Sequence, residues 1–215
     1  GEHSIHTDFA EALPASIQGR VHLNRDGTCN FNATDLLMAG VRIDLRNASG
    51  ALLQSTYTDQ QGEYLFADLF PDAYQVVEHT PATYNGQAVF DGSEQVGTVG
   101  GVILANDTIG QILLTSGIDA LDYNFCELLS ASIGGRVHLN ADGDCNFEPA
   151  AGDILLDGVA IDLIDADGNV LETKITNALG EFSFDSLPPG EYQIIEHQPN
   201  EYNGLKIYDG NESIG

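Results

Sequence analysis

Basic residues are scarce in this chain of 215 residues. It has 7 Lys and Arg against 33 Asp and Glu, a formal net charge of -26. Non-specific binding to nucleic acid requires Lys and Arg side chains that displace counterions from phosphates, so this composition excludes it. Such acidity also disfavours binding to anionic membrane surfaces, and it is typical of a well-solvated surface. With 42% hydrophobic residues, the chain is nevertheless expected to fold and not to be a disordered acidic tail.

Long apolar runs and long helical patterns are also absent. No apolar stretch approaches the roughly 18 residues that a membrane span needs, so no membrane insertion is expected in this segment. Cysteine is limited to Cys29, Cys126 and Cys145. An odd number of cysteines argues against a closed framework of disulfides within this sequence.

The sequence repeats itself at the scale of a whole domain. Residues 15–24 return almost unchanged at 131–140, an offset of 116 residues, and two extra residues at 151 and 152 then shift the offset to 118. A period of this size is too long for a solenoid unit and suits a tandem array of domains. The predicted organisation has three parts: the terminal strand of a preceding repeat at 1–13, a complete domain at 14–129, and a second domain at 130–215 that lacks its C-terminal strand region. Because the sequence begins and ends inside a repeat, we expect either a segment of a longer array of domains or a subunit whose end segments are completed by neighbours.

Alternation of apolar and polar residues predicts short strands separated by turns rich in Gly, Asn and Asp. In the first repeat the expected strands are 16–24, 40–46, 51–58, 62–67, 73–80 and 118–127, with a further strand at either 87–91 or 100–104. The stretch from 97 to 116 could add one more strand or form only a long connection. About seven short strands over roughly 110 residues favour an all-β fold of tandem immunoglobulin-like sandwiches.

The motifs between these strands are distinctive. An acidic loop is followed by Gly-Val-x-Ile-x-Leu, and the second repeat continues with Asp-Ala-Asp-Gly-Asn-Val and Thr-Asn-Ala-Leu-Gly-Glu-Phe-Ser-Phe. Over residues 16–80 and 132–198 this pattern resembles the calcium-binding B-repeat domains of Sdr-type bacterial surface proteins, which are Cna-B-like or prealbumin-like modules. The resemblance implies an extracellular, cell-surface location and a stalk or filament held rigid by calcium. Its expected partners are further copies or repeats of the same unit. It does not imply an enzyme.

The loop after the first strand of each repeat carries oxygen side chains at alternate positions. This is the spacing of an EF-hand-like loop, in which one short segment surrounds a hard cation. With Asp59 from a nearby turn, the expected calcium ligands are Asn24, Asp26, Thr28, Asn30, Asp35, Asp59, Asn140, Asp142, Asp144, Asn146 and Asp153. Position 1 is Asn in both loops and position 5 is Thr28 in the first, so affinity there should be weak, about 10⁻⁴–10⁻³ M. The alternative is an Asx-rich turn without a metal.

Further acidic residues are expected near the same end of the first domain. Sandwich topology brings the 24–35 loop, the 59–62 turn, Glu78 and Glu127 to the end at which the last strand leaves the domain. Calcium there should neutralise clustered carboxylates and stiffen the joint to the next domain. A second acidic pair, Asp91 and Glu94, recurs as Asp209 and Glu212 and is either another metal site or a polar turn.

The same topology selects one disulfide. Cys29 in the first loop and Cys126 near the end of the last strand meet at one end of one domain, so we predict that they pair. Cys145 lies a full strand beyond the linker, about 25 Å away by strand rise. Three free thiols remain the alternative.

No motif points to catalysis: Gly-x-Ser-x-Gly and phosphate loops are absent, and no histidine pair has zinc spacing. The expected function is a structural repeat of an extracellular stalk or filament. The alternative is an adhesin module that binds a host, matrix or glycan ligand, and an enzyme such as a glycan-active hydrolase is the weakest of the three hypotheses.

Overall fold

The computed structural model describes residues 9–25, 27–144, 146–208 and 210. The chain divides into two compact units, Gly1–Leu129 and Ser130–Gly215, and both are built of β-strands. In the described residues the only helix is the short 3-10 turn η1 (Pro149–Ala151). None of the described helical structure is long and apolar enough to cross a membrane.

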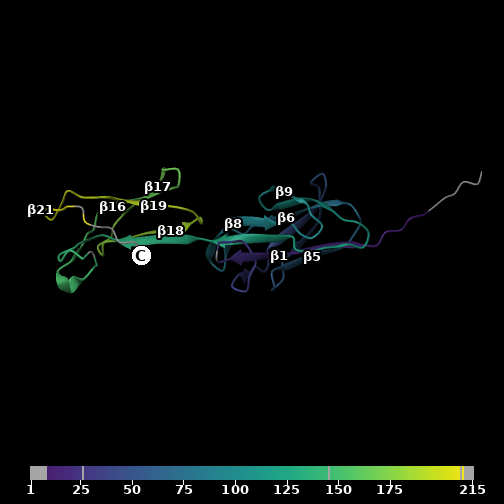
Figure 1. Cartoon of the computed structure of the whole chain (residues 1–215), viewed down its shortest axis with the longest axis horizontal. Coiled ribbons are helices and arrows are strands. Elements are labelled where there is room, and N and C mark those ends of the chain that lie inside the picture. The colour runs from purple at the N-terminus through teal and green to yellow at the C-terminus, as the bar shows by residue number, and fades with distance from the viewer. Residues whose placement is uncertain (1–8, 26, 145, 209, 211–215) are drawn as a thin grey trace, which may run out of the picture. The chain divides into compact units, whose positions relative to one another are not determined.

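Unit 1 consists of two sheets packed face to face (Figure 1). The first sheet is centred on β1 (Ala15–Asn24) and has the order β11-β1-β12-β8-β7, with β2 and β5 also pairing with β1. Its other strands are β2 (Leu36–Leu37), β5 (Glu63–Leu69), β7 (Thr83–Tyr84), β8 (Gln87–Gln95), β11 (Asp119–Ala120) and β12 (Asn124–Leu129). The second sheet has the order β4-β3-β6-β10-β9 and comprises β3 (Arg42–Asn47), β4 (Leu52–Tyr57), β6 (Ala73–His79), β9 (Val102–Ala105) and β10 (Thr108–Leu113).

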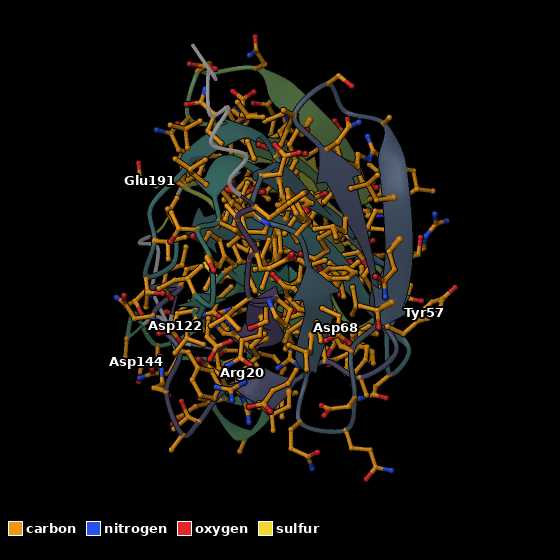
Figure 2. All side chains as sticks on the ribbon, turned by 90° about the vertical axis from the view of Figure 1, so that its right-hand side faces the viewer. Arg20, Tyr57, Asp68, Asp122, Asp144 and Glu191 are labelled. Carbon is orange, nitrogen blue, oxygen red and sulfur yellow. A yellow bond between two sulfur atoms is a disulfide. The ribbon has the colours of Figure 1, made fainter. Side chains whose placement is uncertain are left out.

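Alternation along the strands determines which side chains enter the space between the sheets. In β1, Ile17, Val21 and Leu23 are fully buried. Phe66 of β5 lies beside Ile17 in the same sheet, and Ile43 of β3 joins the core from the second sheet. Successive side chains of a strand point to opposite faces, so a register of this kind places one set of residues inside. On the edge strand β4, by contrast, Tyr57 is 64% exposed and points away from the ribbon (Figure 2).

The register of β1 and β12 positions the functional residues of unit 1. The two strands run parallel, with Leu23 opposite Glu127 and Asn24 opposite Leu128, so both reach the same end of the sandwich. Cys126 and Glu127, as neighbours on β12, point to opposite faces of the sheet. Strand β8 pairs with the other edge of β12 and places Asp91 opposite Glu127.

For one strand of the first repeat the sequence leaves two positions open, 87–91 and 100–104. The structure has a strand at each, β8 and β9, and a further strand, β10, follows. Residues 98–101 and 114–118 are connections.

The expected terminal strand at 1–13 does not form where the structure describes it. Residues 1–8 lie outside the described residues, and 9–13 form no strand. The matching segment of unit 1, 125–129, pairs with β1 and β8 of its own unit. Among the strands that the structure describes, none pairs with residues 9–13. Leu13 instead accepts a hydrogen bond from the Gly117 amide and donates one to Ser116 Oγ, at 3.2 and 2.8 Å.

Unit 2 repeats the first part of unit 1. Its strands are β13 (Ala131–Arg136), β14 (His138–Leu139), β15 (Ile154–Leu155), β16 (Ala160–Ile164), β17 (Val170–Ile175), β18 (Glu181–Leu187), β19 (Gln193–His197), β20 (Glu201–Tyr202) and β21 (Leu205–Lys206). Strand β13 pairs with β18, and β17-β16-β19 form a sheet that corresponds to β4-β3-β6. Ile194 and Ile195 are 39% and 44% exposed, because no described strand of unit 2 takes the place of β10 beside β19.

Candidate metal sites

The loop from Asn140 to Asp153 in unit 2 gathers oxygen atoms in its interior. Its strands β14 and β15 pair at the base, and between them the chain curls. Asn140 Nδ2 lies 3.3 Å from Asp142 Oδ1 and 3.5 Å from Asp144 Oδ1. Asn146 donates its backbone amide and its side-chain amide to Asp144, at 2.9 and 3.0 Å. Side chains from alternate positions therefore point toward one another, as the spacing predicts.

Three carboxylates of this loop could share one ion. Asp142, Asp144 and Glu148 each offer an oxygen, and these atoms all lie within 4.8 Å of one another. All three residues are exposed. The amides of Asn146 lower the pKa of Asp144, so this carboxylate is ionised at neutral pH, as a cation ligand must be. Glu148 was not among the expected ligands. Its place could have suggested it, because it continues the alternation of Asn140, Asp142, Asp144 and Asn146.

Asp153 closes the loop in a different manner from the one expected. Its Oδ1 accepts the backbone amide of Ala141 at 2.8 Å and its Oδ2 accepts that of Glu148 at 2.7 Å. These two bonds lower its pKa, with the Glu148 amide as the larger cause. The carboxylate thus joins the start of the loop to its end. In the EF-hand pattern the closing carboxylate binds the ion through both oxygens, whereas here both oxygens already accept hydrogen bonds.

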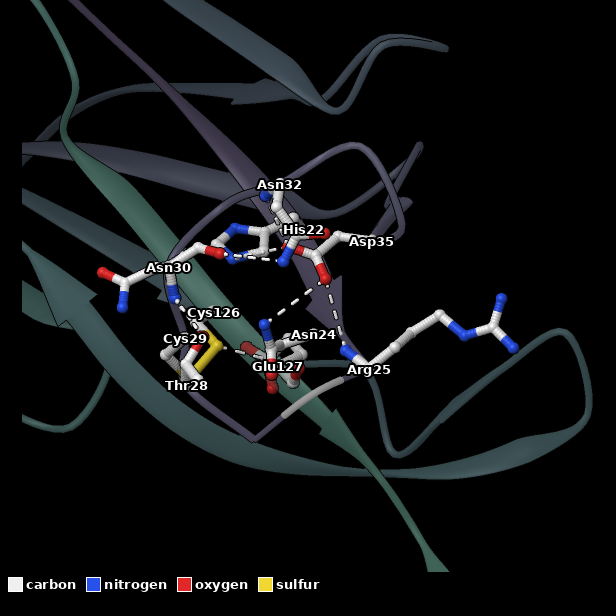
Figure 3. The surroundings of a disulfide bond; sticks show 10 residues. All are labelled: His22, Asn24, Arg25, Thr28, Cys29, Asn30, Asn32, Asp35, Cys126 and Glu127. Carbon is white, nitrogen blue, oxygen red and sulfur yellow. Dashed lines mark hydrogen bonds and ion pairs between the residues drawn. A yellow bond between two sulfur atoms is a disulfide. The ribbon is translucent and has the colours of Figure 1, made fainter.

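The 24–35 loop of unit 1 has the same closure. Asp35 accepts the amide of Arg25 at 3.3 Å and the amide of Asn32 at 2.9 Å (Figure 3). These two amides correspond to those of Ala141 and Glu148 in unit 2. Asp35 also accepts Asn24 Nδ2 at 3.3 Å, and both residues are buried. A repeated, buried carboxylate that holds both ends of a loop indicates that the loop's shape is built into the fold.

Asn24 leaves one oxygen available in this first loop. Its Oδ1 is buried and has no hydrogen-bond donor, and a buried oxygen of this kind is costly unless a partner satisfies it. Thr28 Oγ1 accepts the amide of Asn30 at 3.3 Å, and Asn30 supplies its carbonyl to Asn32 Nδ2 at 3.2 Å. Asp26 lies outside the described residues. The oxygens of this loop suit a hard cation such as Ca²⁺.

An aromatic residue anchors each loop to the strand that precedes it. Phe31 stacks edge-on against His22, with ring centroids 5.3 Å apart, and Arg20 Cζ lies 4.3 Å from its ring centroid. In unit 2, Phe147 contacts His138 at 5.5 Å and Arg136 at 4.9 Å in the same way. Cation–π and aromatic contacts of this type each contribute about 0.5–1.5 kcal/mol. His22 is buried, and burial lowers its pKa.

Asp59, expected as an additional ligand, is engaged in its own turn. Its Oδ1 accepts the amides of Gln61 and Glu63, at 2.8 and 2.9 Å. Asn177 makes the same two bonds in unit 2, to Leu179 and Glu181. Among the described residues, no hydrogen bond or ion pair joins Asp59 to the 24–35 loop, and its role as a ligand stays a prediction.

A disulfide joins Cys29 to Cys126, the pair that the topology argument selected (Figure 3). The two residues are 97 apart in sequence, and their Cα atoms are 5.6 Å apart. The bond ties the 24–35 loop to β12. Cys145 lies outside the described residues.

The fold and the loops together define a class of protein: a tandem array of immunoglobulin-like β-sandwich units, each with an Asx-rich loop after its first strand. The family can be specified further. The model of the SdrD B-like domain matches residues 16–117 and 131–213, once in each unit, and the chain belongs to this family.

Curated relatives support the same assignment. Serine-aspartate repeat-containing protein D of Staphylococcus aureus (strain Newman) is 26% identical over 190 residues, which cover 88% of this chain and 14% of that protein. Serine-aspartate repeat-containing protein C of the same strain is 28% identical over 176 residues, 82% of this chain and 18% of that protein. The chain therefore spans only a small part of these relatives' length.

Solved structures show a more distant likeness. A streptococcal ancillary pilin has a TM-score of 0.38 at 14% identity, with coverage of 95% of this chain and 64% of the pilin. BcpA, the major pilin subunit of Bacillus cereus, has a TM-score of 0.33 at 10% identity, with 93% of each chain covered. Both TM-scores are low. The fold of this chain is defined by its own strand pairing.

Proposed function

We propose that this chain is a structural segment of an extracellular stalk or filament at a bacterial cell surface, and that Ca²⁺ in the 24–35 and 140–153 loops rigidifies its sandwich units. Its partners in this role are further copies or repeats of the same unit. The chemistry is that of a binding and spacing module and involves no catalysis.

The observation that carries the proposal is the shared construction of the two loops. In each, a buried or half-buried carboxylate, Asp35 or Asp153, receives two backbone amides and holds the loop closed. In the second loop the three carboxylates Asp142, Asp144 and Glu148 then face one another without a basic partner in the described ion pairs. Like charges at this separation repel, and a divalent cation would turn that repulsion into attraction.

The total charge makes such neutralisation important for an extended array. At a net charge of -26, units of this chain repel one another and repel further copies. Calcium would reduce that charge and restrict the loops, of which the 24–35 loop lies at the same end of its sandwich as the last strand, β12. A stiffer, less repulsive array is the expected result.

The test compares the shape of the purified chain with and without calcium. Small-angle X-ray scattering of wild type in CaCl₂ should give a narrow distance distribution, and addition of a chelator should broaden it because the loops lose their ion. The double substitution Asp142→Asn and Asp144→Asn should weaken this response, since it removes two of the facing charges. Identical scattering curves in calcium and in chelator would contradict the proposal, and Asp165→Asn, in an exposed hairpin turn, is the matched control.

A further inference from the structure

A second group of carboxylates lies at one end of the unit 1 sandwich, apart from the 24–35 loop. Its five members come from four separate elements: Glu78 from β6, Asp91 and Glu94 from β8, Asp107 from the β9–β10 turn, and Glu127 from β12. Oxygens of Glu78, Asp107 and Glu127 all lie within 4.8 Å of one another, and so do those of Asp91, Glu94 and Asp107. Asp107 belongs to both groups and therefore links them.

Burial makes this cluster unusual. Glu78 is 2% exposed and Glu127 is 0% exposed. Both carboxylate oxygens of Glu78, Oε2 of Glu127 and Oδ1 of Asp107 are buried without a hydrogen-bond donor. A buried carboxylate oxygen without a hydrogen-bond donor is strongly destabilising. Four such oxygens in one place therefore indicate a binding site for a ligand that is not a protein group.

The surrounding protein supplies little compensation. Thr80 Oγ1 lies 3.0 Å from Asp107 Oδ2 and 3.3 Å from Glu127 Oε1, but a hydroxyl has only one proton to donate. The Asp107 amide donates to Glu94. None of the ion pairs among the described residues includes any of the five carboxylates.

A divalent cation would satisfy the four buried, unpartnered oxygens at once, because each of them can serve as a hard oxygen ligand.

We propose that Glu78, Asp91, Glu94, Asp107 and Glu127 form a Ca²⁺ site at the end of the unit 1 sandwich, separate from the 24–35 loop. The donor set is composed of carboxylate oxygens, which suit Ca²⁺ with its six to eight oxygen ligands. Zn²⁺ favours nitrogen and sulfur ligands, and none of the five residues offers either. Mg²⁺ retains several of its waters and seldom occupies a site made wholly of protein groups.

The site is distinct from the loop because the two lie on opposite faces of β12. Cys126 points to the loop, where it pairs with Cys29, and Glu127 points to the space between the sheets. The inference does not depend on calcium binding in the loops. In unit 2, Glu196 matches Glu78, and the residues that match Asp91 and Glu94, Asp209 and Glu212, lie outside the described residues.

This arrangement would place the ion where four elements of the fold converge. The ligands join β6 and the β9–β10 turn of the second sheet to β8 and β12 of the first. A bound ion would therefore hold the two sheets together at the end where the last strand leaves the unit. The half-buried Asp91, Glu94 and Asp107 form the outer side of the cluster, by which an ion could enter.

The test counts calcium ions on the whole chain. Chelator-treated wild type and the double variant Glu78→Gln/Glu127→Gln are titrated with CaCl₂ and examined by native mass spectrometry and isothermal titration calorimetry. The variant is expected to bind one ion fewer. Calcium should also raise its melting temperature less than it raises that of wild type, because the variant lacks two of the proposed ligands.

A second variant covers the case in which the double substitution disturbs folding. Asp107 has φ 59°, a left-handed conformation that Asn adopts readily, so Asp107→Asn should fold and bind calcium at this site at least about tenfold more weakly. If wild type, Glu78→Gln/Glu127→Gln and Asp107→Asn all bind the same number of ions with the same affinities, the inference is overturned, and protons alone neutralise the cluster. The loop variant Asp142→Asn/Asp144→Asn should keep the ion at the unit 1 cluster. If calcium does not bind in the 140–153 loop, this variant binds as many ions as wild type, so a failure of the loop proposal is seen separately.

Discussion

At the scale of single residues, an aspartate at equivalent positions binds neighbouring strands of one sheet in each unit, and in unit 1 it is buried. Asp44, 2% exposed, accepts hydrogen bonds from Ser55 Oγ at 2.6 Å and Arg42 Nε at 2.9 Å, and lies 2.8 Å from His79 Nε2. Burial opposes ionisation of Asp44, but these bonds outweigh it and lower the pKa to about 2. Asp162 of unit 2 repeats the pattern with Thr173 and His197, without a counterpart of Arg42.

Replacement of Asp44 by Asn should destabilise unit 1 by about 1–3 kcal/mol near neutral pH, because hydrogen bonds to a neutral amide are weaker than those to a carboxylate. The pKa of Asp44 is depressed in the folded state, so its contribution is present above about pH 4 and is lost as the pH falls toward 2. Urea denaturation of wild type and variant between pH 7 and pH 2 should therefore show a stability difference that vanishes in acid.

Asp162→Asn is the matched control for this prediction. The Asp162 side chain is 13% exposed and has fewer partners, so its replacement should cost less. A stability difference for Asp44→Asn that is constant across the pH range would contradict the role assigned to its ionised form.

At the scale of elements, the pairing of β1 with β12 and the disulfide act on the same part of the fold. The parallel pairing brings residues from the two ends of unit 1 side by side. The Cys29–Cys126 bond adds a covalent link from the 24–35 loop to β12, close to Asn24 and Glu127 (Figure 3). The loop and the last strand are thus joined where both candidate metal sites lie.

Removal of this bond by Cys29→Ser and Cys126→Ser should lower the stability of unit 1. A disulfide across 97 residues reduces the freedom of the unfolded chain, and its loss is expected to cost about 4–5 kcal/mol. Guanidinium denaturation followed by tyrosine fluorescence measures the effect. A loss below about 1 kcal/mol would show that the bond contributes little to stability, and reduction of wild type with dithiothreitol should reproduce the loss seen in the variant.

At the scale of the whole molecule, charge and repetition set the behaviour. Two units of one family carry 33 acidic residues and 7 basic ones in a single chain. The facing carboxylates of the 140–153 loop and of the unit 1 cluster are local concentrations of this charge. Repulsion of this kind weakens as salt screens it, over about 10 Å at 0.1 M ionic strength.

The melting temperature of the chain should therefore rise with NaCl, and rise more steeply in chelator than in saturating calcium. Calcium at the proposed sites would remove the strongest local repulsions, so less would remain for monovalent salt to screen. Differential scanning calorimetry from 0.02 to 0.5 M NaCl, with and without chelator, measures both slopes. Equal slopes in the two conditions would argue against calcium as the neutralising ion.

Much of this architecture could be read from the sequence because its signals are local. Alternating residues predicted the strands near 16–24 and 73–80, which form as β1 and β6. The regular spacing of Asn140, Asp142 and Asp144 predicted a curled loop, and their side chains do face one another. Repetition of these signals at a fixed offset also indicated two units.

Other features depended on residues far apart in the chain. Asp107 lies in the turn between β9 and β10. For this stretch the sequence predicts either one more strand or only a long connection. Nothing adjacent to Asp107 in sequence indicates that it meets Glu78 and Glu127. The engagement of Asp153 with two backbone amides was likewise hidden, because a carboxylate at a ligand position looks the same in sequence whether it binds an ion or closes the loop.

The sequence by itself determined the β-rich, acidic, tandem character of the chain and the position of its Asx-rich loops, since these follow from residue type and spacing along a short segment. The tertiary structure alone decided that five carboxylates from four elements converge at the end of one sandwich. The reason is that strand register, set by the packing of both sheets, determines which face of β12 carries Glu127 and which carries Cys126.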